Sequence, residues 1–189
     1  MKFKLMKYQK INSKLFIKNR KKFLTRMKPN SVAFFNSNDI YPVSADSTLP
    51  FEQHRDIFYL SGVDQEESVL MLCPSCSKQN LREVLFLKET DEHIAVWEGP
   101  KLNKKQAFET SGVESVFWLH EMENIIDKVM NECETIYFNH NEHYRAKIEL
   151  ETREERFNKW LKSKYPNKLK ERSNPILQHF RSIKDPIEL

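Results

Sequence analysis

The sequence predicts a mixed α/β domain in which helical segments lie on either side of a β-rich middle. Apolar runs of strand length alternate there with short polar connections, whereas earlier and later segments carry apolar residues at helical spacing. The chain has 189 residues, of which 39 % are hydrophobic and 31 % charged, with thirteen Phe and three Trp, enough to form a core. This composition excludes a disordered or collagen-like chain, and no segment approaches the ~20 consecutive apolar residues of a membrane helix.

The first predicted element is an amphipathic helix between Ser13 and Pro29. Ser13 is suited to cap it, and Phe16, Phe23 and Met27 follow helical spacing on one face. Lysines occupy the other face. Because no aromatic residues interleave with these lysines on the polar face, we interpret them as a solvated face rather than as a nucleic-acid site.

The middle of the chain is predicted to be an antiparallel meander. A strand at 31–35 precedes the segment 36–50, which has no sustained period and is predicted to be a long loop. Four further β-rich runs are separated by short polar connections, which favours antiparallel neighbours, because parallel pairs need longer crossovers. These runs are 57–60, 69–73, 83–87 and 93–97.

The second half alternates helices and strands. Asn103 is expected to cap a helix that passes through Phe108 and ends at Gly112. Spacing and composition then predict a strand at 116–118, a helix at 121–130, a strand at 135–138 and an exposed helix at 144–162, whose i,i+4 pairs are Glu149 with Arg153 and Glu155 with Lys159.

The last five residues have the features of a helix start. Asp185 suits an N-cap, Pro186 the first helical position, and Glu188 the closing residue of a capping box. An isolated helix needs at least ~12 residues. We therefore expect a further domain to follow in the parent protein.

Charge is unevenly distributed along the chain. The net charge is +4, yet residues 1–38 hold eleven Lys or Arg and no acid, so residues 39–189 carry a net charge of −7. Because the basic residues are confined to one segment without a recognition motif, we expect neither a nucleic-acid nor a membrane partner. Three cysteines form no disulfide framework, and the start lacks the features of a targeting peptide, so a cytoplasmic location is expected.

Cys73 and Cys76 form a C-P-S-C motif. A redox motif of this kind would open a helix, whereas here it connects two predicted strands. Ordinary reduced thiols are therefore favoured. The alternatives are redox chemistry and a zinc site, which would need further ligands from Cys133 or a distant His.

The histidines and glycines do not form a known catalytic pattern. His140 and His143 match neither arrangement of the zincin motifs and are interpreted as part of a polar loop, and His54 is interpreted as an isolated histidine. Only three glycines are present, which form no phosphate loop, and no nucleophile elbow is found. The residues alone therefore predict no catalytic centre and no metal ligands.

Four segments in register resemble the N-terminal domain of aminopeptidase P, in the creatinase and prolidase superfamily. The resemblance covers residues 11–189. It rests on the opening helix with Phe16, Arg20 and Met27, on R-D-I-F-Y-L-S-G within the longer match at 44–72, on A-V-W-E-G-P-K-L at 95–102, and on R-S-I-K-D-P-I-E-L at 181–189.

This resemblance implies a mixed sheet of about six strands flanked by helices, of the creatinase/prolidase N-terminal type. It divides the chain into a basic extension at 1–10, the domain itself at 11–175, and the start of a linker helix at 176–189. In family members the catalytic domain that follows provides two Asp, one His and two Glu to two manganese ions. None of those ligands is in this chain, so it is expected to be inactive alone, within a parent that removes the residue preceding proline.

The resemblance also implies roles for Asp46 and Trp97, which match family residues bordering the substrate cavity. A carboxylate can attract the α-ammonium of a peptide, and an indole can form an apolar wall. The alternatives are a turn-forming Asp and a Trp packed in the core. Implied partners are the catalytic domain, further copies in a homo-oligomer, and a proline-containing peptide. The runner-up function is a non-catalytic module that binds peptides or histones.

Overall fold

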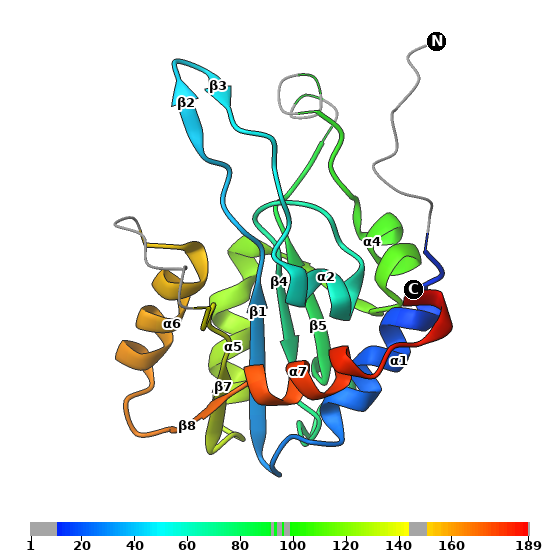
Figure 1. Ribbon diagram of the computed structural model, residues 1–189. Helices are drawn as coiled ribbons and strands as arrows, with labels where there is room; N and C mark the ends of the chain where they lie inside the picture. Colours follow the sequence, from blue (N-terminus) through cyan, green and yellow to red (C-terminus); the bar gives the residue numbers. More distant parts are fainter. Residues whose placement is uncertain (1–10, 92, 94–95, 97–98, 144–150, 189) are drawn as a thin grey trace.

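The computed structural model describes residues 11–91, 93, 96, 99–143 and 151–188 (Figure 1). A six-stranded sheet lies between two groups of helices, and a separate two-stranded hairpin projects beyond it. The strands are β1 (Ser31–Asn36), β2 (Pro42–Ser44), β3 (Ser47–Thr48), β4 (Val69–Leu72), β5 (Glu83–Leu87), β6 (Ser115–Trp118), β7 (Thr135–Phe138) and β8 (Leu169–Arg172). The helices are α1 (Ser13–Leu24), α2 (Arg55–Ser61), α4 (Lys104–Ser111), α5 (Met122–Met130), α6 (Arg153–Lys164) and α7 (Asn174–Ser182), with short 3₁₀ turns at Gln79–Leu81, Leu119–Glu121 and Pro186–Glu188.

The sheet is mixed, with the strand order β6-β5-β4-β1-β7-β8. Strand β4 pairs antiparallel with both β1 and β5, whereas the pairs β1–β7, β7–β8 and β5–β6 are parallel. Five strands therefore run in one direction and β4 alone runs against them. The carboxyl ends of β1, β5 and β7 consequently meet at one edge of the sheet. The mixed six-stranded sheet expected from the resemblance is confirmed.

Both faces of the sheet are buried over its central strands, whereas the edge strand β8 is largely exposed. On one face, side chains of β1, β4 and β7 pack with Ile126 of α5 and Leu161 of α6. On the other, Phe23 of α1, Leu60 of α2 and Leu177 of α7 pack against the alternate residues of the same strands. All six residues of β1 are buried. This accounts for its continuous S-V-A-F-F-N run, because a central strand covered on both faces shows no polar alternation.

The predicted strand at 57–60 is wrong, because these residues lie in α2. The His54 side chain accepts a hydrogen bond from the Asp56 N–H and caps the helix, and Gly62 ends it in the left-handed conformation at φ 68°. An added Cβ at Gly62 would lie 2.2 Å from the Phe16 ring, so this position also needs glycine for space. A four-residue apolar run cannot distinguish a strand from a buried helical turn by its period.

The remaining differences concern loops and helix ends. The predicted loop at 36–50 contains the β2–β3 hairpin, and His93 and Val96, the described residues of the predicted strand 93–97, are helical. Helix α1 is capped by Asn12 instead of Ser13. Helix α6 begins after Thr152, and much of the earlier part of the predicted helix 144–162, including Glu149, lies outside the described residues. Lys159, predicted to pair with Glu155, pairs with Glu151.

Capping residues identified in the sequence are confirmed for α4. Asn103 and Gln106 form a reciprocal capping box, and Gly112 ends the helix in the left-handed conformation. At the end of the chain, Asp185 N–H donates to Glu188 Oε2 over 2.7 Å, as a capping box requires. The predicted strands at 69–73, 83–87, 116–118 and 135–138 correspond to β4, β5, β6 and β7.

Arg20 connects the elements on the α1 side of the sheet. Its side chain is fully buried; Nε donates to Glu83 Oε2 at 2.6 Å, and Nη1 donates to the carbonyls of Leu60 and Ser111, each at 2.9 Å. Burial lowers the pKa of the Arg20 guanidinium. One side chain of α1 thus contacts α2, α4 and β5 through charge-assisted hydrogen bonds.

Candidate functional site

The carboxyl edge of the sheet carries the β2–β3 hairpin, which follows β1 and extends away from the core (Figure 1). Ala45 and Asp46 form its turn, where Ala45 has φ 49°. Asp46 is exposed, and its carboxylate makes no hydrogen bond or ion pair within the described part of the chain. The structure therefore places Asp46 in a turn and also leaves its charge available to another molecule.

Trp97 lies outside the described residues. The connection that contains it begins where β5 ends, at the same edge as the hairpin. Its second part is anchored: Lys101 forms an ion pair with Glu66, and the Leu102 N–H donates to Gln65 Oε1 at 2.7 Å. The described residues thus show that the Asp46 hairpin and the Trp97 connection start from one edge. The roles of Asp46 and Trp97 at a substrate cavity stay predictions.

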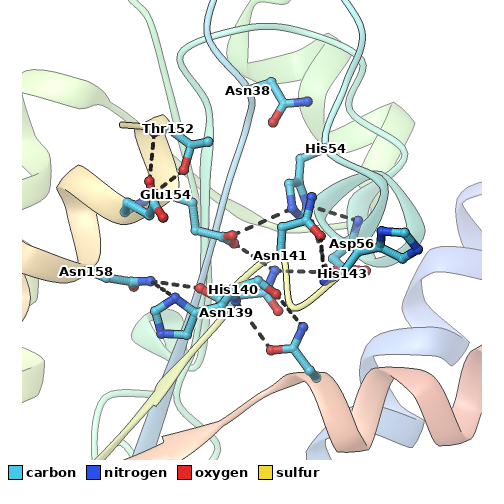
Figure 2. A network of polar contacts seen from close by, with 12 residues as sticks. Asn38, His54, Asp56, Asn139, His140, Asn141, His143, Thr152, Glu154 and Asn158 are labelled. Carbon is cyan, nitrogen blue, oxygen red and sulfur yellow. Dashed lines mark hydrogen bonds and ion pairs between the residues drawn. The ribbon is translucent and has the colours of Figure 1, made fainter. Parts of the chain in front are cut away.

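A buried polar network lies below this edge, centred on Asn139, the residue after β7 (Figure 2). Asn139 Nδ2 donates to Asp56 Oδ2 at 2.9 Å and to Glu154 Oε1 at 2.7 Å, and its carbonyl accepts from Asn158 Nδ2 at 2.8 Å. Arg181 donates to the other oxygen of Asp56 at 2.5 Å. The network therefore joins α2, α6 and α7 at the end of β7.

The electrostatics of this network differ between its two carboxylates. Asp56 has Arg181 as a cationic partner, whereas Glu154 is deeply buried and, besides accepting from Asn139, has its Oε2 3.7 Å from His54 Nε2. Burial raises the pKa of the Glu154 carboxyl. His54 Nδ1 accepts from the Asp56 N–H, so a neutral His54 carries its proton on Nε2, which faces Glu154. These contacts around Asn139 are suited to holding α2, α6 and α7 together at the end of β7.

Next to the network is an open pocket of about 900 Å³. Its lining includes His140 and His143 together with His54, which the sequence analysis interprets as isolated, and also Arg55 and Arg181. Burial lowers the pKa of His140. Within the described residues, no group of three or more His, Cys, Asp or Glu side chains is arranged to hold a metal ion. The signal that could have pointed here is N-H-N-E-H, because polar residues directly after a strand gather at its carboxyl end.

The cysteines lie at the opposite edge of the sheet. Cys73 and Cys76 are in the β4–β5 connection, as predicted, and Cys133 precedes β7 with its Sγ 3.4 Å from Cys73 Sγ. All three are buried and free. The hydrogen bond with Cys133 raises the pKa of the Cys73 thiol. Buried free thiols behave as small apolar groups, consistent with the interpretation as reduced thiols.

The family model described as the N-terminal domain of aminopeptidase P matches residues 16–137. The chain belongs to this family. Among curated relatives, it is 27 % identical over 157 residues to Xaa-Pro aminopeptidase 3 of Rattus norvegicus, covering 81 % of this chain and 30 % of that protein. It is 25 % identical over 181 residues to the Xaa-Pro aminopeptidase of Escherichia coli, covering 95 % of this chain and 41 % of that protein. This chain thus spans less than half the length of these relatives.

Solved structures show the same fold. The low-pH form of E. coli aminopeptidase P superposes with a TM-score of 0.74 at 24 % identity, covering 94 % of this chain and 40 % of that chain. The zinc-substituted form of the E. coli protein in complex with product gives a TM-score of 0.75 at 24 % identity, covering 95 % of this chain and 41 % of that chain.

In the part of the present chain that the structure describes, no helix is both long and apolar enough to span a membrane.

Proposed function

We propose that this chain is the non-catalytic N-terminal domain of a metal-dependent Xaa-Pro aminopeptidase, where it borders the substrate cavity and contributes to a homo-oligomer. The observation that supports this most directly is Asp46, an exposed carboxylate at the tip of a projecting hairpin, without a partner among the described residues. Such a group is suited to attract the α-ammonium of a peptide whose second residue is proline.

The chemistry itself belongs to the domain that follows. The described residues offer no cluster of ligands for a metal ion, so they do not fit the two manganese ions of the proposed parent. Those ions would be held by the catalytic domain, and this chain would position the substrate. Free, buried cysteines and the charge pattern are consistent with a cytoplasmic protein without nucleic-acid or membrane partners.

The test uses a reading frame extended past Leu189 and an Xaa-Pro peptide, with and without manganese. Release of the first residue is expected from the longer protein with the metal, and not from the 189-residue chain. Asp46→Asn should raise KM for the peptide with a small effect on folding, because the carboxylate is exposed. Glu134→Gln serves as a control, because it removes one exposed carboxylate just before β7, at the opposite edge of the sheet. Turnover by the short chain, or an Asp46→Asn enzyme with unchanged KM, would contradict the proposal.

A second candidate is a non-catalytic module that binds peptides or histones. It is favoured by the net charge of −7 over residues 39–189, which suits a cationic partner. A folded, metal-free and inactive longer protein that binds a basic histone-tail peptide would support this function instead.

A further inference from the structure

A groove of about 560 Å³ lies on the outer face of α1, away from the carboxyl edge of the sheet. Its floor includes Ile17 and Phe180, both partly exposed, and Phe180 comes from α7. Four lysines of α1 line its walls; they are Lys14, Lys18, Lys21 and Lys22. No aromatic side chain of α1 lines the groove with these lysines, but the fold supplies Phe180 from a distant element.

Most of this positive charge is not neutralised. Within the described residues, Lys14, Lys21 and Lys22 make no ion pair, although Lys22 lies near enough to Asp185 to help Lys18 lower the pKa of that carboxyl. In contrast, the α1 residue Arg20 is paired with Glu83. Three ammonium groups around a concave apolar floor form a surface that binds negative charge and apolar area together.

The groove already accepts one carboxylate from within the chain, because Lys18 pairs with Asp185. Beside it, on the buried side of α1, Asn19 Nδ2 donates to Glu188 Oε1 at 3.2 Å. Both acids belong to the short segment that follows α7 and lies beside α1 (Figure 1). This internal contact shows how an acidic segment can lie along α1 with a carboxylate on one of its lysines.

We propose that the α1 groove binds an acidic peptide segment of a partner protein that inserts an apolar side chain between Ile17 and Phe180. A single half-buried phenyl ring provides no series of stacking platforms for a nucleic acid, and lysines lack the bidentate geometry that arginines offer to phosphates. The body of the chain, with a net charge of −7 over residues 39–189, would also repel a long polyanion. Ile17 and Phe180 are only partly exposed, whereas insertion into a membrane requires a projecting apolar face.

The experiment measures fluorescence anisotropy with the purified 189-residue chain and a labelled twelve-residue peptide of Glu and Asp with two central Leu. Binding is expected at low ionic strength and should weaken strongly at about 0.3 M salt. Lys14→Ser, Lys21→Ser and Lys22→Ser together should weaken it about tenfold, the combined effect of three exposed ion pairs. A matched control removes the same charge from exposed lysines elsewhere, namely Lys105, Lys128 and Lys170.

The apolar floor is tested separately from the charge. Replacing the two Leu of the peptide by Ser should weaken binding severalfold while the protein stays unchanged, so the result does not depend on a variant folding. Phe180→Ser should weaken binding of the Leu peptide and leave binding of the Ser peptide unchanged.

Four outcomes would overturn the proposal. They are no binding at low salt, equal losses in the control and groove variants, equal affinity for the Leu and Ser peptides, and tighter groove-dependent binding of a single-stranded oligonucleotide or of vesicles rich in anionic phospholipid. None of these readouts involves peptidase activity, so they are independent of the function proposed above.

Discussion

Replacing Arg20 by Met should destabilise the domain more than almost any other single change to a polar side chain. Methionine fills much of the same space, so the main loss is polar: one hydrogen bond to Glu83 and two to the carbonyls of Leu60 and Ser111. Glu83 is 29 % exposed and can be rehydrated, whereas Arg20 itself is fully buried. At roughly 1 kcal/mol for each hydrogen bond, the free energy of unfolding should fall by about 3 kcal/mol.

Urea unfolding followed by circular dichroism measures this loss of free energy. The same loss should lower the melting temperature by roughly 9 °C in a chain of this size. Arg20→Lys should be intermediate, because one ammonium group cannot reach the carboxylate and both carbonyls together. Combining Arg20→Met with Glu83→Gln should show a coupling of about 1 kcal/mol, because Glu83 has already lost its partner in the single variant. A loss below about 1 kcal/mol for Arg20→Met would refute the role assigned to this residue.

Three further changes test other parts of the structure. Gly62→Ala should lower the free energy of unfolding by about 3 kcal/mol, measured by thermal unfolding, because φ is 68° and the new Cβ would meet the Phe16 ring. Gly99→Ala, at φ 80° with open space around it, should lower it by only about 1 kcal/mol. Equal losses in the two variants would contradict the steric argument. Asn103→Ala should lower the free energy of unfolding by about 1 kcal/mol through loss of the α4 cap, and an unchanged urea midpoint would contradict it. Burial raises the pKa of Glu154 in the folded state, so this carboxyl binds its proton more tightly when the protein is folded. The wild type should therefore lose stability as the pH rises from 4.5, the ordinary pKa of the group, through the folded pKa. Glu154→Gln should remove that part of the pH dependence, and parallel curves of urea midpoint against pH for the two proteins would refute it.

Local signals in the sequence were sufficient for several elements. Asn103 and Gly112 define the ends of α4 through interactions within a few residues, and the apolar runs of β4, β5 and β7 are long enough to be recognised. Helix α2 was missed because its four apolar residues fit a strand equally well, and what decides for the helix is the His54 cap and the packing of Gly62 on Phe16.

The candidate site could be predicted only in part. Asp46 was identified through the resemblance, and its hairpin was not, because its residues lack any alternation that a buried face would impose. The network around Asn139 depends on Asp56, which is 83 residues away, and on Arg181, 125 residues from Asp56. Contacts at such separations follow from strand order, which no local pattern of residues determines.

The single reversed strand has a consequence for how far Asp46 can reach. Because β4 runs against β1, the segment 37–68 leaves the sheet and returns to it at the same edge. Ser37 and Ser68 close that segment by exchanging hydrogen bonds, with the Ser37 N–H donating to the Ser68 carbonyl at 2.9 Å and the Ser68 N–H donating to Ser37 Oγ at 3.0 Å. Residues can therefore be added to or removed from the hairpin without moving either strand. The length of β2 and β3 then determines how far the Asp46 carboxylate lies from the edge of the sheet, whose strands keep their positions.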